Sequence, residues 1–134
     1  MSQIRVKDAA HYLGVSADTV RRWAEDGTLT STKSSTGVTM LDGLELAHLA
    51  RQRAVLPEDP SGMESSARNR FVGLVTRVVT DKVMAQVELQ CGPHRVVSLM
   101  SAEAVKELAL EPGSVAVAVV KSTTVIVETP GRRI

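Results

Sequence analysis

Residues 56–65 read LPEDPSGMES, and this stretch divides the chain into two parts of different character. It is rich in proline, serine, glycine and acidic residues, a composition typical of linkers. Before it, up to about Arg53, apolar residues recur at helical spacing, whereas from Phe71 onward they fall in short β-branched runs between turn residues. The sequence therefore predicts two domains, residues 1–54 and 65–130, joined by a linker at 55–64.

The overall composition is that of a soluble globular protein, with 43% hydrophobic and 23% charged residues. The formal net charge is only +1, so DNA binding would depend on where a few arginines and lysines lie. The single cysteine, Cys91, excludes an intrachain disulfide and a cysteine-based zinc site. No stretch approaches the roughly 18 apolar residues of a membrane span, and we expect a cytoplasmic protein.

Two helices joined by a tight turn are predicted in the first domain. Residues 6–13 have the spacing of a short helix, which Gly14 can end as a C-cap. Ser16 is a good N-cap for a second helix over residues 17–26, and Gly27 follows it. Helix, turn and helix in this order are typical of a DNA-binding motif.

The start of the second helix carries the candidate DNA contacts. A recognition helix presents its first residues to the major groove, and arginine there can contact guanine or phosphate. Trp23, at core spacing from Val20, is expected to pack between helices. The candidate contacts from this region are Ser16, Asp18, Thr19, Arg21 and Arg22.

The segments VKDAAHYLGVS (residues 6–16) and TVRRWAEDGTL (19–29) resemble the MerR-type and excisionase-like helix-turn-helix. The resemblance implies double-stranded DNA as a partner, a β wing, and a third helix, here residues 44–52 after Asp42 as cap. The family usually has Gly-Gly-His-Arg in the wing, whereas this chain has TGVTM at residues 36–40. With the wing arginine absent, Lys33 remains as a phosphate contact, and we expect weak binding by one module, strengthened by multivalency.

The second domain has the pattern of a small β-barrel. Strands are predicted at residues 70–80, 83–89, 95–100, 115–121 and 124–128, with one short helix at 102–108. Strands of this number and length suit an OB-like barrel. The predicted fold class is therefore α+β in two domains: an N-terminal all-α, winged helix-turn-helix domain and a C-terminal OB-like barrel.

No catalytic pattern is present, because the chain lacks a Ser-His-acid spacing and a Walker-type glycine loop. His11, His48 and His94 do not group as metal ligands, so we expect neither an enzyme nor a metal site. The notable polar residues at strand edges are instead hydrogen-bond donors, which suit a tetrahedral dianion. They are Ser66, Arg68, Asn69, Ser101, Lys121, Ser122 and Thr123.

Three segments resemble the molbindin, or Mop, domain, a TOBE-like module: SARNRFVGLV (66–75), SAEAVKELALEPG (101–113) and VVKSTTV (119–125). The resemblance implies molybdate or tungstate bound between domains of a homo-oligomer, a hexamer or trimer of dimers. The ligands carried over are Ser66, Arg68, Ser101, Lys121 and Ser122. Ala104 stands where the family often has serine or threonine, so one hydroxyl is missing.

Together the two halves predict a transcriptional regulator that responds to molybdate or tungstate. One alternative is a molybdate or tungstate storage or buffering protein with weak or architectural DNA binding. Another is an architectural DNA-binding protein whose barrel only holds copies together. High anion capacity without operator-specific binding would favour the former, and DNA binding indifferent to anions the latter.

Overall fold

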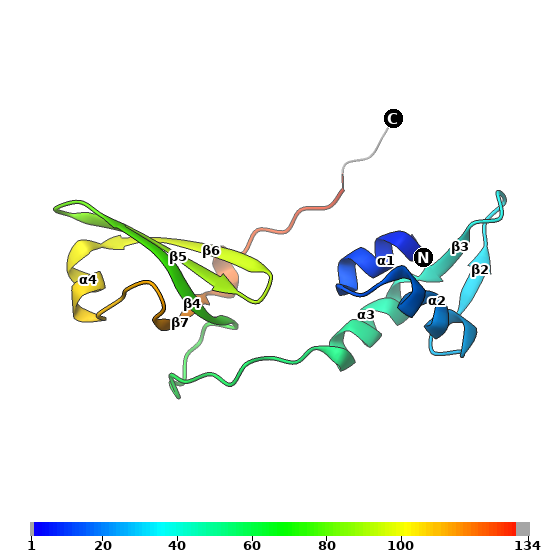
Figure 1. Cartoon of the computed structure of the whole chain (residues 1–134), viewed down its shortest axis with the longest axis horizontal. Helices are drawn as coiled ribbons and strands as arrows, with labels where there is room; N and C mark the ends of the chain where they lie inside the picture. The colour runs from blue at the N-terminus through cyan, green and yellow to red at the C-terminus, as the bar shows by residue number, and fades with distance from the viewer. Residues whose placement is uncertain (1, 131–134) are drawn as a thin grey trace. The chain divides into compact units, whose positions relative to one another are not determined.

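The computed structural model describes residues 2–130 and separates into two compact units, Met1–Leu56 and Pro57–Ile134 (Figure 1). Each unit has its own hydrophobic core. None of the helices between residues 2 and 130 has the length and apolar character that crossing a bilayer requires.

The first unit combines three helices with a small antiparallel sheet of order β1-β3-β2. The three helices and the β wing were predicted, but the strand at residues 3–5 was not. It pairs with β3, placing Ile4 opposite Leu41. The elements are β1 (Gln3–Arg5), α1 (Val6–Leu13), α2 (Ala17–Glu25), β2 (Ser31–Lys33), β3 (Thr39–Asp42) and α3 (Gly43–Arg53).

Local capping explains where these helices begin and end. Gly14 follows α1 with a φ of 68°, a left-handed conformation that favours glycine. The Ser16 hydroxyl accepts a hydrogen bond from the Thr19 amide, and the Asp42 carboxylate accepts one from the Glu45 amide. The predicted caps are confirmed: Gly14 and Ser16 define the turn between α1 and α2, and Asp42 defines the start of α3.

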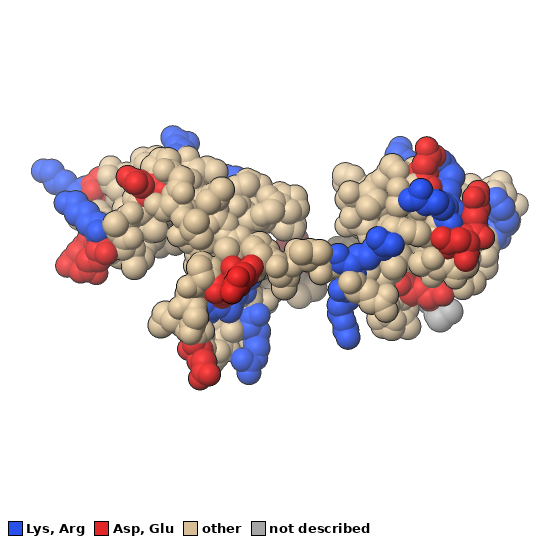
Figure 2. All heavy atoms as spheres, turned by 60° about the horizontal axis from the view of Figure 1, so that its bottom comes forward, with Lys and Arg blue, Asp and Glu red and all other residues tan. Residues whose placement is uncertain are grey.

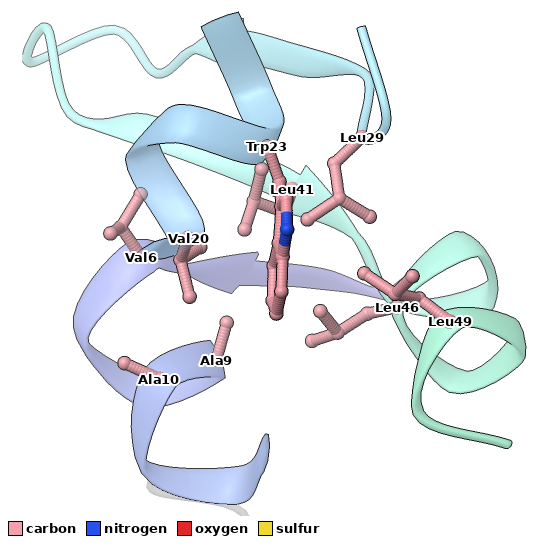
Figure 3. Packing of buried hydrophobic residues seen from close by; sticks show 9 residues of the cluster. All are labelled: Val6, Ala9, Ala10, Val20, Trp23, Leu29, Leu41, Leu46 and Leu49. Atoms are coloured by element: carbon pink, nitrogen blue, oxygen red, sulfur yellow. The ribbon is translucent and has the colours of Figure 1, made fainter. Parts of the chain in front are cut away.

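Trp23 lies at the centre of the first core, with only 5% of its surface exposed. Figure 3 shows its ring between α1, the sheet and α3, surrounded by aliphatic side chains. The prediction that this indole packs rather than contacts DNA is therefore confirmed. Its neighbours in the core are Val6, Ala9, Ala10, Val20, Leu29, Leu41, Leu46 and Leu49.

The second unit is an antiparallel sheet of order β6-β5-β4-β7, with a short helix at one end. Alternation along β5 buries Ala85, Val87 and Leu89 on its inner face. The elements are β4 (Asn69–Thr80), β5 (Met84–Cys91), β6 (His94–Ser101), α4 (Ala102–Glu107), β7 (Val115–Val120) and a 3-10 turn, η1 (Ser122–Thr124).

The predicted fifth barrel strand, residues 124–128, was wrong. Thr124 ends η1, and residues 125–128 form neither helix nor strand. Ile126 and Val127 are 86% and 83% exposed, so neither side chain is packed against the rest of residues 2–130. Three β-branched residues favour an extended backbone, but a strand also needs a neighbouring edge with which to exchange hydrogen bonds. The sheet is therefore an open half-barrel.

An open concavity of about 940 Å³ remains along this unit, lined by apolar residues of β6 and β7 together with Pro60, Ser61 and Met63. Elsewhere the sheet is closely packed. A Cβ atom at Gly73 would lie 2.4 Å from the carbonyl oxygen of Gln90 and 2.6 Å from Sγ of Cys91, so only glycine fits there.

Candidate oxyanion site and nucleic-acid interface

Arg68 and Lys121 lie at adjoining strand ends. Asn69 and Val120 form the last pair of the antiparallel β4–β7 ladder. Arg68 and Lys121 therefore lie one residue beyond this pair, next to each other at the ends of two neighbouring strands. The Asn69 side-chain amide donates to the Val120 carbonyl at 3.2 Å and holds this end together. Two of the predicted anion ligands are thus brought together.

The serines of the predicted site flank the same end. Ser66 and Arg68 stand on either side of Ala67, which is 6% exposed, whereas both of them are exposed. On the other strand, the Lys121 carbonyl accepts hydrogen bonds from the Thr124 amide at 3.0 Å and the Thr124 hydroxyl at 2.8 Å. This turn presents Ser122 directly after Lys121. Ser66, Arg68, Lys121 and Ser122 therefore belong to one exposed group of donors.

Ser101 lies at the opposite end of the sheet. It ends β6 and pairs with Met84, while Thr80, at the far end of β4, pairs with Ala85. At 3.3 Å per residue, β4 separates this end from Arg68 by on the order of 35 Å along the strand. Figure 1 shows α4, which begins after Ser101, at the end of the sheet away from η1. Within one chain, Ser101 cannot join the other four predicted ligands.

The Ser101 side chain also has a structural role. Its oxygen accepts a hydrogen bond from the Ala104 amide at 3.0 Å and caps α4. Its hydroxyl proton stays free to donate. The backbone amide of Ala104 is therefore already occupied by this cap.

Several candidate DNA contacts on α2 are paired with one another. The Ser16 and Thr19 hydroxyls lie 2.9 Å apart, and Nη1 of Arg21 donates to Asp18 at 2.8 Å. The Asp18 and Arg21 side chains are 92% and 60% exposed, so solvent weakens this pair and DNA phosphate can compete for Arg21. Arg22 is exposed on the same helix.

Lys33 lies on the wing, where its ammonium donates to the Thr39 hydroxyl at 2.8 Å. Sequence reasoning missed two further cations, Arg5 and Lys7, which line a hollow of about 340 Å³ together with Arg21. They precede and begin α1, and the sheet brings them beside the wing. Arg5 and Lys7 flank the buried Val6, and this alternation was the signal that could have identified them. Placing them beside the wing, however, also depended on the pairing of β1 with β3, which the sequence did not predict.

The surface charge is mixed. Figure 2 shows blue and red side chains next to one another on both units, with no wide area of a single sign on this face. Hydrogen bonds from Thr28 hold the pKa of Asp26 below its ordinary value, which keeps a negative charge near Arg22. Over residues 2–130, no group of three or more histidine, cysteine or acidic residues could hold a metal ion.

Comparison with protein families assigns both units. A model described as TOBE domain matches residues 65–127, and a model described as helix-turn-helix domain matches residues 4–54. The chain is 37% identical over 68 residues to the molybdenum transport protein ModE of Herbaspirillum seropedicae, a match covering 50% of this chain and 25% of that protein. This chain thus spans about a quarter of ModE.

Two further relatives match the second unit. Molybdenum-pterin-binding protein 2 of Clostridium pasteurianum is 38% identical over 66 residues, covering 48% of this chain and 97% of that protein. A crystal structure of the cytoplasmic molybdate-binding protein ModG with molybdate bound has 40% identity and a TM-score of 0.50, covering 57% of this chain and 55% of that chain. None of these relatives is described as an enzyme, in agreement with the sequence prediction. The chain therefore belongs to the TOBE-domain, or molbindin, family, and carries a helix-turn-helix domain in front of that module.

Proposed function

We propose that this protein is a DNA-binding transcriptional regulator that responds to molybdate or tungstate and acts in the cytoplasm. The observation that carries the proposal is the meeting of Arg68 and Lys121 at the β4–β7 end, in a chain that also contains a helix-turn-helix unit. The family relatives named for molybdenum or molybdate support the choice of anion.

The donor chemistry favours an unprotonated tetrahedral dianion. Residues 65–68 and 119–125 contain one arginine, one lysine and several hydroxyls, and no carboxylate. Such a group offers both charged and neutral donors to the four oxygens of a tetrahedral anion. Hydrogen phosphate carries a proton that would meet few acceptors, whereas molybdate, tungstate and sulfate carry none near neutral pH. Selectivity for molybdate over sulfate would then depend on the size of the completed site.

A complete site requires two copies of the chain. Because Ser101 lies at the far end of the sheet, its hydroxyl can join Arg68 and Lys121 only from another subunit. The unpaired edges of β6 and β7 and the open apolar concavity support association. We therefore propose a homo-oligomer, a hexamer or trimer of dimers, with the anion bound at its interfaces.

DNA would be bound by α2 and the wing. Arg21, Arg22 and Lys33 supply the contacts, and Arg5 and Lys7 extend the basic surface beside Arg21. This is a small number of cations, so one module binds weakly, and several modules on one oligomer supply the affinity. Anion binding shifts DNA affinity to the extent that it favours one arrangement of subunits over another.

Calorimetric titration tests the anion, and electrophoretic retardation with and without molybdate tests its link to DNA. The proposal requires tight binding of molybdate or tungstate, poor binding of sulfate, and a change in DNA affinity when the anion is added. The pairing of Arg21 with Asp18 and of Lys33 with Thr39 favours the alternative of a storage or buffering protein. High anion capacity without operator-specific DNA binding would establish that alternative.

A further inference from the structure

Asp59, Ser61 and Arg70 form a closed hydrogen-bonded network between the start of the second unit and β4. Nε of Arg70 donates to Asp59 Oδ2 at 2.6 Å, and Nη2 of Arg70 donates to the Ser61 hydroxyl at 2.6 Å. The other carboxylate oxygen of Asp59 accepts from the Ser61 amide at 2.9 Å and from its hydroxyl at 2.7 Å. Every member of the network therefore bonds to both of the others.

This network is better shielded than the exposed ion pairs of the first unit. The side chains of Asp59 and Arg70 are 33% and 24% exposed, whereas those of Arg21 and Asp18 are 60% and 92% exposed. The Arg70 guanidinium, followed by the two Ser61 hydrogen bonds, holds the pKa of Asp59 well below 3.8. The carboxylate therefore stays charged throughout the neutral range, and the pair does not open by titration there.

Just before the linker, the end of α3 is held to the core of the first unit. Arg53, the last residue of α3, places its guanidinium carbon 4.5 Å from the centre of the buried Trp23 ring. Between Arg53 and Asp59, residues 54–58 are exposed and form neither helix nor strand. Six residue steps span at most about 20 Å. Without the network, the next buried anchor is Ala67, fourteen steps from Arg53, and the free chain reaches about 50 Å.

We propose that Asp59, Ser61 and Arg70 form a latch that more than halves the free chain between the two units and ties the DNA-binding unit to the strand that carries the oxyanion ligands. Arg70 is two residues from Arg68, so an anion bound by Arg68 would lie close to the anchor of the latch. The latch is a feature of the structure itself, and its effect on DNA binding rests on the function proposed above.

Hydrogen–deuterium exchange on the full chain tests the latch without any ligand. Asp59→Ala removes the carboxylate, and Arg70→Met keeps an apolar stem on the sheet. We expect each to increase exchange at the Ser61 and Met63 amides, which donate hydrogen bonds within residues 60–64, at least threefold, with no further increase in the double variant. Exchange of β5 should stay unchanged. Glu58→Ala, a neighbouring carboxylate with no ion pair within residues 2–130, is the matched control and should leave exchange as in the wild type. Equal exchange of residues 60–64 in all these proteins would overturn the latch.

The effect on regulation is measured as the ratio of DNA affinities with and without molybdate. We expect Asp59→Ala to reduce this ratio at least fivefold, while its molybdate affinity stays within twofold of wild type. An unlatched variant that keeps the wild-type ratio would overturn the coupling. A wild-type protein that binds no molybdate would instead refute the proposed function, and the exchange measurement would still decide whether the latch exists.

Discussion

The Asn69 side chain donates a hydrogen bond to the Val120 carbonyl across the last pair of the β4–β7 ladder, at 3.2 Å. This bond fixes the point at which the two strands part, and directly beyond it the chain presents Arg68 on one side and Lys121 on the other. This end of the sheet therefore carries two adjacent cations.

Arg68→Ala and Lys121→Ala should each weaken molybdate binding about 10- to 100-fold, because a hydrogen bond from a charged donor contributes about 1.5–3 kcal/mol. Both side chains are exposed, so thermal stability should stay near that of the wild type. Isothermal titration calorimetry measures the affinity. Lys82→Ala, in the exposed turn after β4, is the control, and an equal loss of affinity there would show that only net charge matters.

Arg21→Ala and Arg22→Ala together should abolish DNA retardation. Arg22→Ala alone should weaken binding and reduce the slope of log affinity against log salt by about one, the effect of one lost phosphate contact. Asp18→Ala should act in the opposite direction, because it releases Arg21 from its carboxylate partner and removes a negative charge. Lys106→Ala, on α4 of the other unit, serves as control. Unchanged DNA binding by the double variant would reject α2 as the recognition helix.

Gly73→Ala should destabilise the second unit by about 1–3 kcal/mol, the usual cost of overpacking, because the added methyl group meets the backbone of Gln90. In a domain of this size, this corresponds to a fall in melting temperature of roughly 4–8 °C per kcal/mol. Differential scanning calorimetry checks the change against Thr76→Ala, an exposed position on the same strand. Melting temperatures that are the same for both variants would show that β4 and β5 do not approach so closely at Gly73.

Ile126→Asp should dissociate the oligomer or reduce its size. The residue is 86% exposed in the single chain, and we expect residues 124–128 to find a strand edge only on a neighbouring subunit. Analytical ultracentrifugation measures the assembly. Val55→Asp, at a linker position that is 92% exposed, is a matched control that should assemble normally. Assembly of Ile126→Asp identical to the wild type would exclude this segment from the interface.

Local signals predicted the helices of the first unit well. Each helix end is defined by a residue directly beside it: the caps Ser16 and Asp42 and the left-handed Gly14. The strand at residues 3–5 gave no such signal, because three residues cannot show alternation and its partner, β3, lies more than 30 residues away.

In the second unit, the sequence predicted strands better than their ends or partners. β5 was expected from Val83 but begins at Met84, because the Asp81 carboxylate accepts the amides of both residues at 2.8 Å and keeps them in a turn. Residues 124–128 have strand composition without a partner edge. Motif resemblance indicated the proposed anion ligands, but only the register of the sheet separates Ser101 from Arg68 and Lys121.

Mixing two defective subunits measures whether the oxyanion site is shared between copies. One subunit carries Arg68→Ala and Lys121→Ala, and the other carries Ser101→Asp, which retains a capping oxygen for the Ala104 amide but repels a dianion. Neither should bind molybdate alone. After the two are unfolded and reassembled together, random pairing should restore wild-type affinity at about a quarter of the sites, because a site built from the intact end of each subunit is complete. Full molybdate binding by either variant alone, or none in the mixed oligomer, would contradict a site formed between subunits.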